Sequence, residues 1–86
     1  MNKQEIQENI NNMRNEIDEI YYSKTSHEIW EALHETAEET RDMVDFADYK
    51  DLWDELAMAT EYIYAERYDE AASKLKKAWK LTTKMN

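Results

Sequence analysis

The chain has 86 residues, contains no cysteine, glycine or proline, and carries 20 acidic against 11 basic residues, for a formal net charge of −9. This length fits one small domain. The missing residue types exclude disulfides, sulfur-ligated metals and glycine-rich phosphate loops. The acidic balance disfavours direct contact with nucleic acid or an anionic membrane and favours association with basic proteins. No apolar run predicts a signal peptide or a membrane span, so we expect a cytoplasmic location.

Apolar residues recur at spacings of three and four along the chain, among residues that favour helices. This pattern predicts an all-α fold, a small three- or four-helix bundle of antiparallel helices that forms a single domain over residues 1–86. Disorder is the alternative for so charged a chain, and the three tryptophans and six tyrosines argue against it. We expect helices at about 3–22, 26–45, 48–65 and 68–83.

The first expected helix carries an apolar seam with the heptad spacing of a coiled coil. Its residues are Ile6, Ile10, Met13, Ile17 and Ile20. The seam is only about two heptads long and is accompanied by asparagines, which are poor helix formers, so it needs a partner surface. That surface is either the rest of a bundle or a second copy of the chain, and we expect a homodimer through this seam.

The second expected helix starts near Ser26, because Thr25 and Glu28 have the spacing of a capping box. Opposite its apolar side, carboxylates recur at steps of three and four. They are Glu28, Glu31, Glu35, Glu38, Asp42 and Asp45. Each like-charged pair at this spacing costs an isolated helix about 0.2–0.5 kcal/mol. The stripe is therefore either tolerated because packing elsewhere dominates, or kept because a cationic partner binds it.

The third expected helix starts near Asp48, and the fourth places its lysines after its acids, the favourable order for the helix dipole. From Ala71 to the end of the chain there are lysines and no acidic residue. Either the fourth helix lies beside an acidic helix and neutralises it, or the two charged poles stay separate. We expect one core to be shared by Trp30, Leu33, Leu56, Ile63, Leu75 and Trp79.

The acidic residues of the second and third helices form the candidate partner-binding surface, with Tyr49 as an aromatic anchor. The full set is Glu28, Glu31, Glu35, Glu38, Asp42, Asp45, Asp48, Tyr49, Asp51, Asp54 and Glu55. Six carboxylates on one helix span about 26 Å, roughly one per 4–5 Å, whereas duplex DNA carries about one charge per 1.7 Å. Mimicry of DNA therefore requires both helices to face the partner.

Neither catalysis nor metal binding is predicted. His27, Glu31, His34 and Glu38 share one helical face at the spacing by which bundles hold di-metal centres, but no second Glu-x-x-His motif supplies ligands from another helix. No nucleophile stands beside a base and an oxyanion-hole loop. We therefore expect no enzyme activity, no metal and no cofactor.

Residues 55–83 resemble a single tetratricopeptide-repeat hairpin, most clearly in the stretch YIYAERYDEAASKLKKAWKL from Tyr62 to Leu81. An aromatic and a small residue lie on the first helix, and a Tyr-Asp-Glu-Ala entry opens the second. Glu66 stands where the family prefers glycine, and no second copy appears about 34 residues upstream. A solenoid needs about three repeats, so the resemblance implies one antiparallel hairpin within a bundle.

The segments HETAE (34–38) and DYKDLWDELA (48–57) are similar to phage-encoded antirestriction proteins of the DNA-mimic type, which are small acidic helical chains. The spacer between the helices is longer here, and the family's Val-Pro is missing. This resemblance implies inhibition by occupying a DNA-binding groove. We therefore expect an acidic binding protein that occupies a basic surface of a partner, as a phage or mobile-element inhibitor of a nucleic-acid-binding defence protein in the host cytoplasm. The alternative is a structural adaptor or oligomerisation module acting through the N-terminal isoleucine seam.

Overall fold

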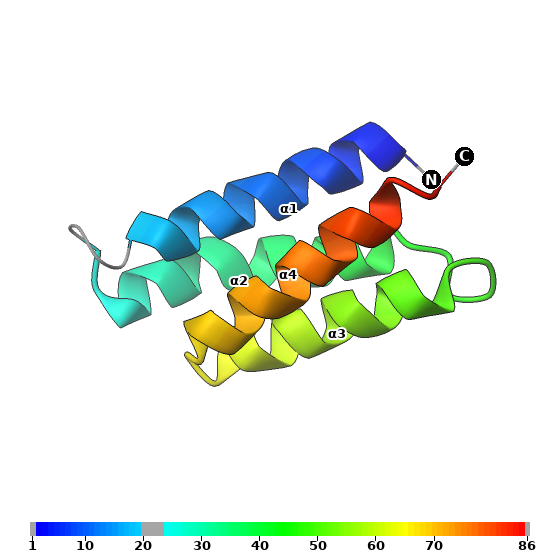
Figure 1. The fold of residues 1–86 in the computed structure, drawn as a ribbon. Coiled ribbons are helices and arrows are strands. Elements are labelled where there is room, and N and C mark those ends of the chain that lie inside the picture. The colour runs from blue at the N-terminus through cyan, green and yellow to red at the C-terminus, as the bar shows by residue number, and fades with distance from the viewer. Residues whose placement is uncertain (1, 20–23, 86) are drawn as a thin grey trace.

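The computed structural model describes residues 2–19 and 24–85, and these residues form four α-helices joined by short connections (Figure 1). The helices are α1 (Lys3–Asp18), α2 (Ser26–Asp42), α3 (Lys50–Tyr64) and α4 (Tyr68–Thr82). No strand occurs in the described ranges, so the all-α bundle predicted from the sequence is confirmed. None of these helices is both long enough and apolar enough to cross a bilayer.

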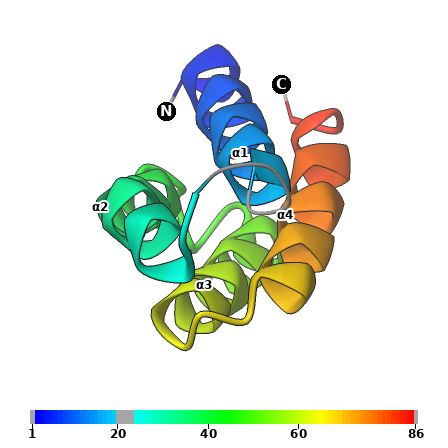
Figure 2. The ribbon, with the colours of Figure 1, turned by 90° about the vertical axis from the view of Figure 1, so that its left-hand side faces the viewer.

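The helices pack as a four-membered ring when the bundle is viewed end on (Figure 2). Each neighbours the helices before and after it in the chain, and α4 also packs against α1. The helix with the acidic stripe, α2, therefore lies diagonally opposite the lysine-rich α4. The bundle measures 37 × 19 × 18 Å.

The core is built from one apolar stripe per helix. Leu33, Leu56 and Leu75 are at most 1% exposed and belong to one cluster of buried side chains, as does Ile63. Trp30 and Trp79 pack against this cluster but stay partly exposed. The shared core is thus confirmed, with the two tryptophans at its edge.

The α1 seam, predicted as an oligomerisation surface, lies inside this core. Ile6 and Ile10 are 0% exposed, Met13 is 1% and Ile17 is 3% exposed. The expectation of a bare seam that pairs with a second copy is wrong, because α1 packs against α2 and α4 of its own chain and leaves no free apolar surface there. Ile20 and the predicted extension of this helix to 22 lie outside the described residues.

The helix α2 begins where the sequence predicts, but it ends earlier than predicted. Thr25 Oγ1 accepts a hydrogen bond from the Glu28 backbone N–H at 3.2 Å, which caps a helix that begins at Ser26. The helix ends at Asp42, so Asp45 lies in the connection to α3 and not on the helix as predicted.

The turn between α3 and α4 explains why glycine would be favoured at Glu66. Glu66 has a φ of 57°, in the left-handed region. The Arg67 N–H donates to the Tyr62 carbonyl at 2.8 Å and the Glu66 N–H donates to the Ile63 carbonyl at 3.0 Å, the two bonds of a Schellman motif. A β-carbon in this conformation costs about 1–2 kcal/mol, so the turn closes at the expense of local strain.

We expect Glu66→Gly to raise the free energy of unfolding by about 0.5–1 kcal/mol, because the relieved strain exceeds the added entropy of the unfolded chain. Loss of the exposed hydrogen bond from Ser26 Oγ to Glu66 Oε1, at 2.8 Å, reduces the gain slightly. Urea unfolding checks this against Glu66→Ala, which loses the same hydrogen bond but keeps the β-carbon. A glycine variant no more stable than the alanine variant would contradict the assignment of strain.

Candidate functional site

The outward side of α2 forms a continuous acidic surface, here named the α2 acidic face. It consists of Glu28, Glu31, Glu35, Glu38 and Asp42. Glu38 is half-buried and the other four are exposed. Within the described residues the one lysine or arginine paired with this face is Arg41, whose Nε lies 3.1 Å from the adjacent Asp42. Among the described residues, no lysine or arginine from another helix therefore offsets the repulsion among these carboxylates.

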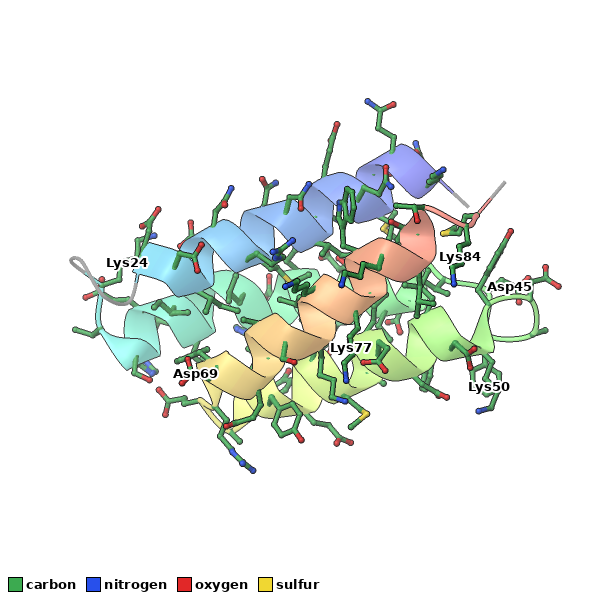
Figure 3. All side chains as sticks on the ribbon, viewed as in Figure 1. Lys24, Asp45, Lys50, Asp69, Lys77 and Lys84 are labelled. Carbon is green, nitrogen blue, oxygen red and sulfur yellow. The ribbon has the colours of Figure 1, made fainter. Side chains whose placement is uncertain are left out.

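Three more of the predicted acidic residues lie in the α2–α3 connection or in the first turns of α3. Asp45 and Asp48 lie within the connection, where Asp45 Oδ1 accepts a hydrogen bond from the Ala47 N–H at 2.9 Å. Asp54, on α3, pairs with Lys50 at 2.9 Å. Figure 3 shows Asp45 and Lys50 at the same end of the bundle.

Asp51 and Glu55 do not join the α2 acidic face. Both line a groove between α3 and α4, and Glu55 lies 3.8 Å from Lys74 Nζ of α4. The prediction that the acids of the third helix extend the acidic surface is wrong for this pair, because the packing of α3 directs them toward the lysine-rich helix. The two-helix acidic surface needed to approach the charge density of DNA is only partly formed.

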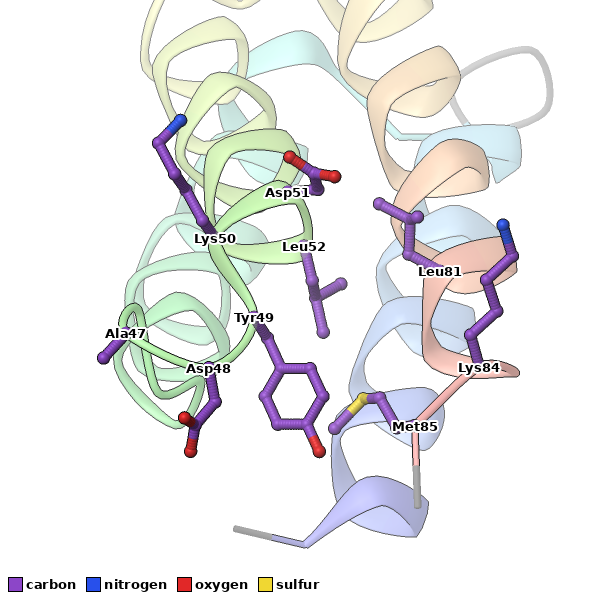
Figure 4. A pocket seen from close by; sticks show the side chains of 9 residues that line it. All are labelled: Ala47, Asp48, Tyr49, Lys50, Asp51, Leu52, Leu81, Lys84 and Met85. Carbon is purple, nitrogen blue, oxygen red and sulfur yellow. The ribbon is translucent and has the colours of Figure 1, made fainter.

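Tyr49, the predicted anchor, also lies away from the α2 acidic face. It is half-buried and lines a pocket of about 330 Å³ with Leu52, Leu81 and Met85 (Figure 4). Its ring points toward Met85, beyond the end of α4. The chain therefore needs other aromatic residues if a partner is to be anchored beside the carboxylates.

An aromatic cluster borders the α2 acidic face on the side of α3. Trp30 stacks between His27 and His34, with ring centroids 5.9 and 4.2 Å away. Tyr64 of α3 meets Trp30 edge-on at 5.7 Å, and its hydroxyl donates a hydrogen bond to the Glu38 carboxylate. This cluster joins α2 to α3 and places a half-exposed tyrosine directly beside the acidic face.

A second aromatic pair lies at the other end of the α2–α3 contact, where Phe46 meets Trp53 edge-on at 5.1 Å. Phe46 is 49% and Tyr64 is 44% exposed. Among the described residues only Met58 is a comparably exposed large hydrophobic side chain. Exposed rings beside charged residues are typical of protein-binding surfaces.

Carboxylates raise the pKa of two groups along this surface. The Glu38 carboxylate, by accepting a hydrogen bond from the Tyr64 hydroxyl, raises the pKa of Tyr64 above its ordinary 10.0. Asp54 raises the pKa of Lys50 in the same way. Both shifts favour the protonated form, so at neutral pH Tyr64 remains a hydrogen-bond donor and Lys50 remains charged.

The two histidines of α2 contact different groups. His27 Nε2 lies 2.9 Å from Glu31 Oε1, whereas His34 Nδ1 lies 2.9 Å from the Trp30 carbonyl oxygen. Within residues 2–19 and 24–85 no three His, Cys, Asp or Glu side chains are grouped so that they could hold a metal ion.

No protein-family model matches this sequence, and no curated protein and no solved structure matches it either.

Proposed function

We propose that this chain is a binding protein whose α2 acidic face occupies a basic surface of another protein and so inhibits it. The observation that supports this is the row of carboxylates on α2, which no lysine or arginine of another helix pairs with in the part of the chain that the structure describes. Like charges at these spacings destabilise a helix by about 0.2–0.5 kcal/mol per pair. A small domain has little stability to spare, and a lysine- or arginine-rich partner would turn this repulsion into attraction.

The lysines of α4 lie too far from α2 to neutralise its carboxylates. They lie on the helix diagonally opposite α2, across a bundle with a cross-section of 19 × 18 Å. Exposed charges separated by more than a Debye length, about 8 Å at physiological ionic strength, are largely screened from each other. A partner that approaches α2 therefore meets mainly negative charge, with Arg41 as the one lysine or arginine on that helix.

Phe46 and Tyr64 would give this interface contacts that do not depend on charge. Charged groups steer association and fix the orientation of a complex, whereas buried aromatic side chains commonly supply most of its binding energy. The two rings lie at opposite ends of the α2–α3 contact, next to the acidic residues. We assign to them the anchoring role that the sequence suggested for Tyr49.

The partner that best suits this surface is a protein that binds nucleic acid. Carboxylates on successive helical turns follow one another at about 4.5–6 Å, sparser than the phosphates of one DNA strand at about 3.4 Å. The α2 acidic face would therefore replace part of one strand in a basic groove and not a whole duplex. The resemblance to antirestriction proteins favours the same class of partner, and within this proposal the chain is a phage or mobile-element inhibitor that acts in the host cytoplasm.

Competition with duplex DNA tests the proposal. We expect the immobilised chain to retain a nucleic-acid-binding protein from cell extract at low salt, and to release it when duplex DNA or high salt is added. Phe46→Ala with Tyr64→Ala should abolish retention, while Met58→Ala, which removes the third exposed hydrophobic side chain, should not. A retained protein that excess duplex DNA fails to displace would contradict occupation of its nucleic-acid groove.

A further inference from the structure

We propose that a second copy of this chain docks along the groove between α3 and α4 and forms a twofold-symmetric dimer. Two cavities of about 330 and 350 Å³ lie on this side of the bundle, and both are lined by Asp51, Leu81 and Lys84. They form one continuous groove, here named the α3–α4 groove. It is distinct from the α2 acidic face and from the buried seam of α1.

The two walls of the α3–α4 groove carry opposite charges. Asp51 and Glu55 line it from α3, where Lys50 also lies but is paired with Asp54, whereas the wall formed by α4 and the residues after it is basic. The basic residues are Lys77, Lys80 and Lys84. All three lysines are exposed, and none forms an ion pair within the described residues. Figure 3 shows Lys77 on α4 and Lys84 just beyond the end of that helix.

The floor of the groove is apolar at the end where α3 begins and α4 ends. Leu52 and Leu81 line the same pocket there, and the ring of Tyr49 lies beside Met85 (Figure 4). The groove thus combines a hydrophobic centre with charged edges, which is the usual anatomy of a protein–protein interface.

A groove with one acidic and one basic wall is complementary to itself under one particular rotation. When the twofold axis runs along the groove, α3 of one copy lies over α4 of the other. Each residue keeps its position along the length of the groove. The start of α3 is level with the end of α4, because the two helices are antiparallel neighbours. Asp51 would then face the partner's lysines near Lys84. An axis across the groove would place the acidic walls against each other, so charge selects the first arrangement.

The size of this face also suits a second copy. It is one long side of a bundle that measures 37 × 19 × 18 Å, which is comparable to the area of about 800 Å² that each partner buries in a standard interface. A polyanion would meet Asp51 and Glu55 in the same groove, and a basic peptide would meet the three lysines. Only a partner with basic residues opposite the acidic wall and acidic residues opposite the basic wall is attracted to both.

Analytical ultracentrifugation at low salt, over a series of protein concentrations, measures the dimer. Two matched variants each reverse one wall: Asp51→Lys with Glu55→Lys, and Lys77→Glu with Lys80→Glu. We expect either variant alone to associate at least about tenfold more weakly than the wild-type chain, because both walls of its groove then carry net charge of the same sign. An equimolar mixture of the two variants should form a heterodimer, since the mostly basic groove of one variant then meets the mostly acidic groove of the other, with Lys84 unchanged in both.

Far-ultraviolet circular dichroism checks that each variant is folded. If the double variant on α3 unfolds because it loses the Glu55–Lys74 pair, Asp51→Lys alone takes its place. Reversal on α2, as Glu35→Lys with Asp42→Lys, should leave the dimer unchanged, which separates this proposal from the proposed function. A wild-type chain that stays monomeric at millimolar concentration, wall variants that dimerise normally, or a mixture that stays monomeric would each overturn the dimer.

Discussion

Leu56→Ala should remove most of the stability of this protein, with a loss of about 2–4 kcal/mol in the free energy of unfolding. Leu56 is 1% exposed and belongs to the cluster that all four helices share. Truncation removes buried carbon atoms and leaves a cavity that a ring of four packed helices closes only in part. A domain of this size without disulfides has a margin of roughly 3–5 kcal/mol, so the loss is close to the whole margin.

Urea unfolding followed by circular dichroism measures this loss. Met58→Ala is the matched control on the same helix, because Met58 is 38% exposed and its truncation should change the free energy of unfolding by less than about 0.5 kcal/mol. If Leu56→Ala stayed as stable as Met58→Ala, the bundle would not depend on a single shared core.

The helical fold could be predicted from the sequence because each helix carries one apolar stripe at a regular spacing. Leu33, Leu56 and Leu75 follow that spacing and are buried as expected. The end of α2 could not be predicted, because Val44 and Asp45 continue the apolar and acidic pattern beyond the last helical residue. No glycine or proline marks the turn in this chain.

The surface against which the α1 seam packs could not be predicted, for a different reason. A heptad stripe has the same spacing whether it packs on helices of its own chain or on a second copy. Ile10 is completely buried because α2 and α4 present matching apolar stripes within the same bundle. Only the arrangement of the helices in space distinguishes the two cases.

The acidic face was predictable to the extent that it lies on one helix. Glu28 to Asp42 all belong to α2, so helical spacing alone places them together. On α3, Asp54 and Glu55 are adjacent in sequence but point about 100° apart, and the packing of the bundle decides which one faces α4. The aromatic cluster was missed because it requires Tyr64, which is distant from Trp30 in sequence.

Reversal of two carboxylates in the α2 acidic face should have opposite effects on folding and on partner binding. Glu35 lies between Glu31 and Glu38 at helical spacing, and Asp42 follows Glu38 by four residues. Within the α2 acidic face, Glu35→Lys with Asp42→Lys therefore converts three repulsive neighbour pairs into attractive ones, which should raise the free energy of unfolding by about 1–3 kcal/mol. The lysine at position 42 also suits the last turn of the helix, and the exposed pair with Arg41 that it replaces contributes little.

Binding to a basic partner should weaken at least about a hundredfold in the same variant, because two attractive contacts become repulsive. Glu8→Lys with Asp18→Lys is the matched control, since both residues are exposed on α1 and the change in net charge is the same. Unfolding and capture measured on both variants separate the local effect from the overall charge. A variant that gained stability and still bound its partner normally would make the acidic face a solubilising surface, and the proposed function would then be wrong. If the free energy of unfolding did not change, solvent would already screen these carboxylates from one another. The repulsion that supports a cationic partner would then be absent.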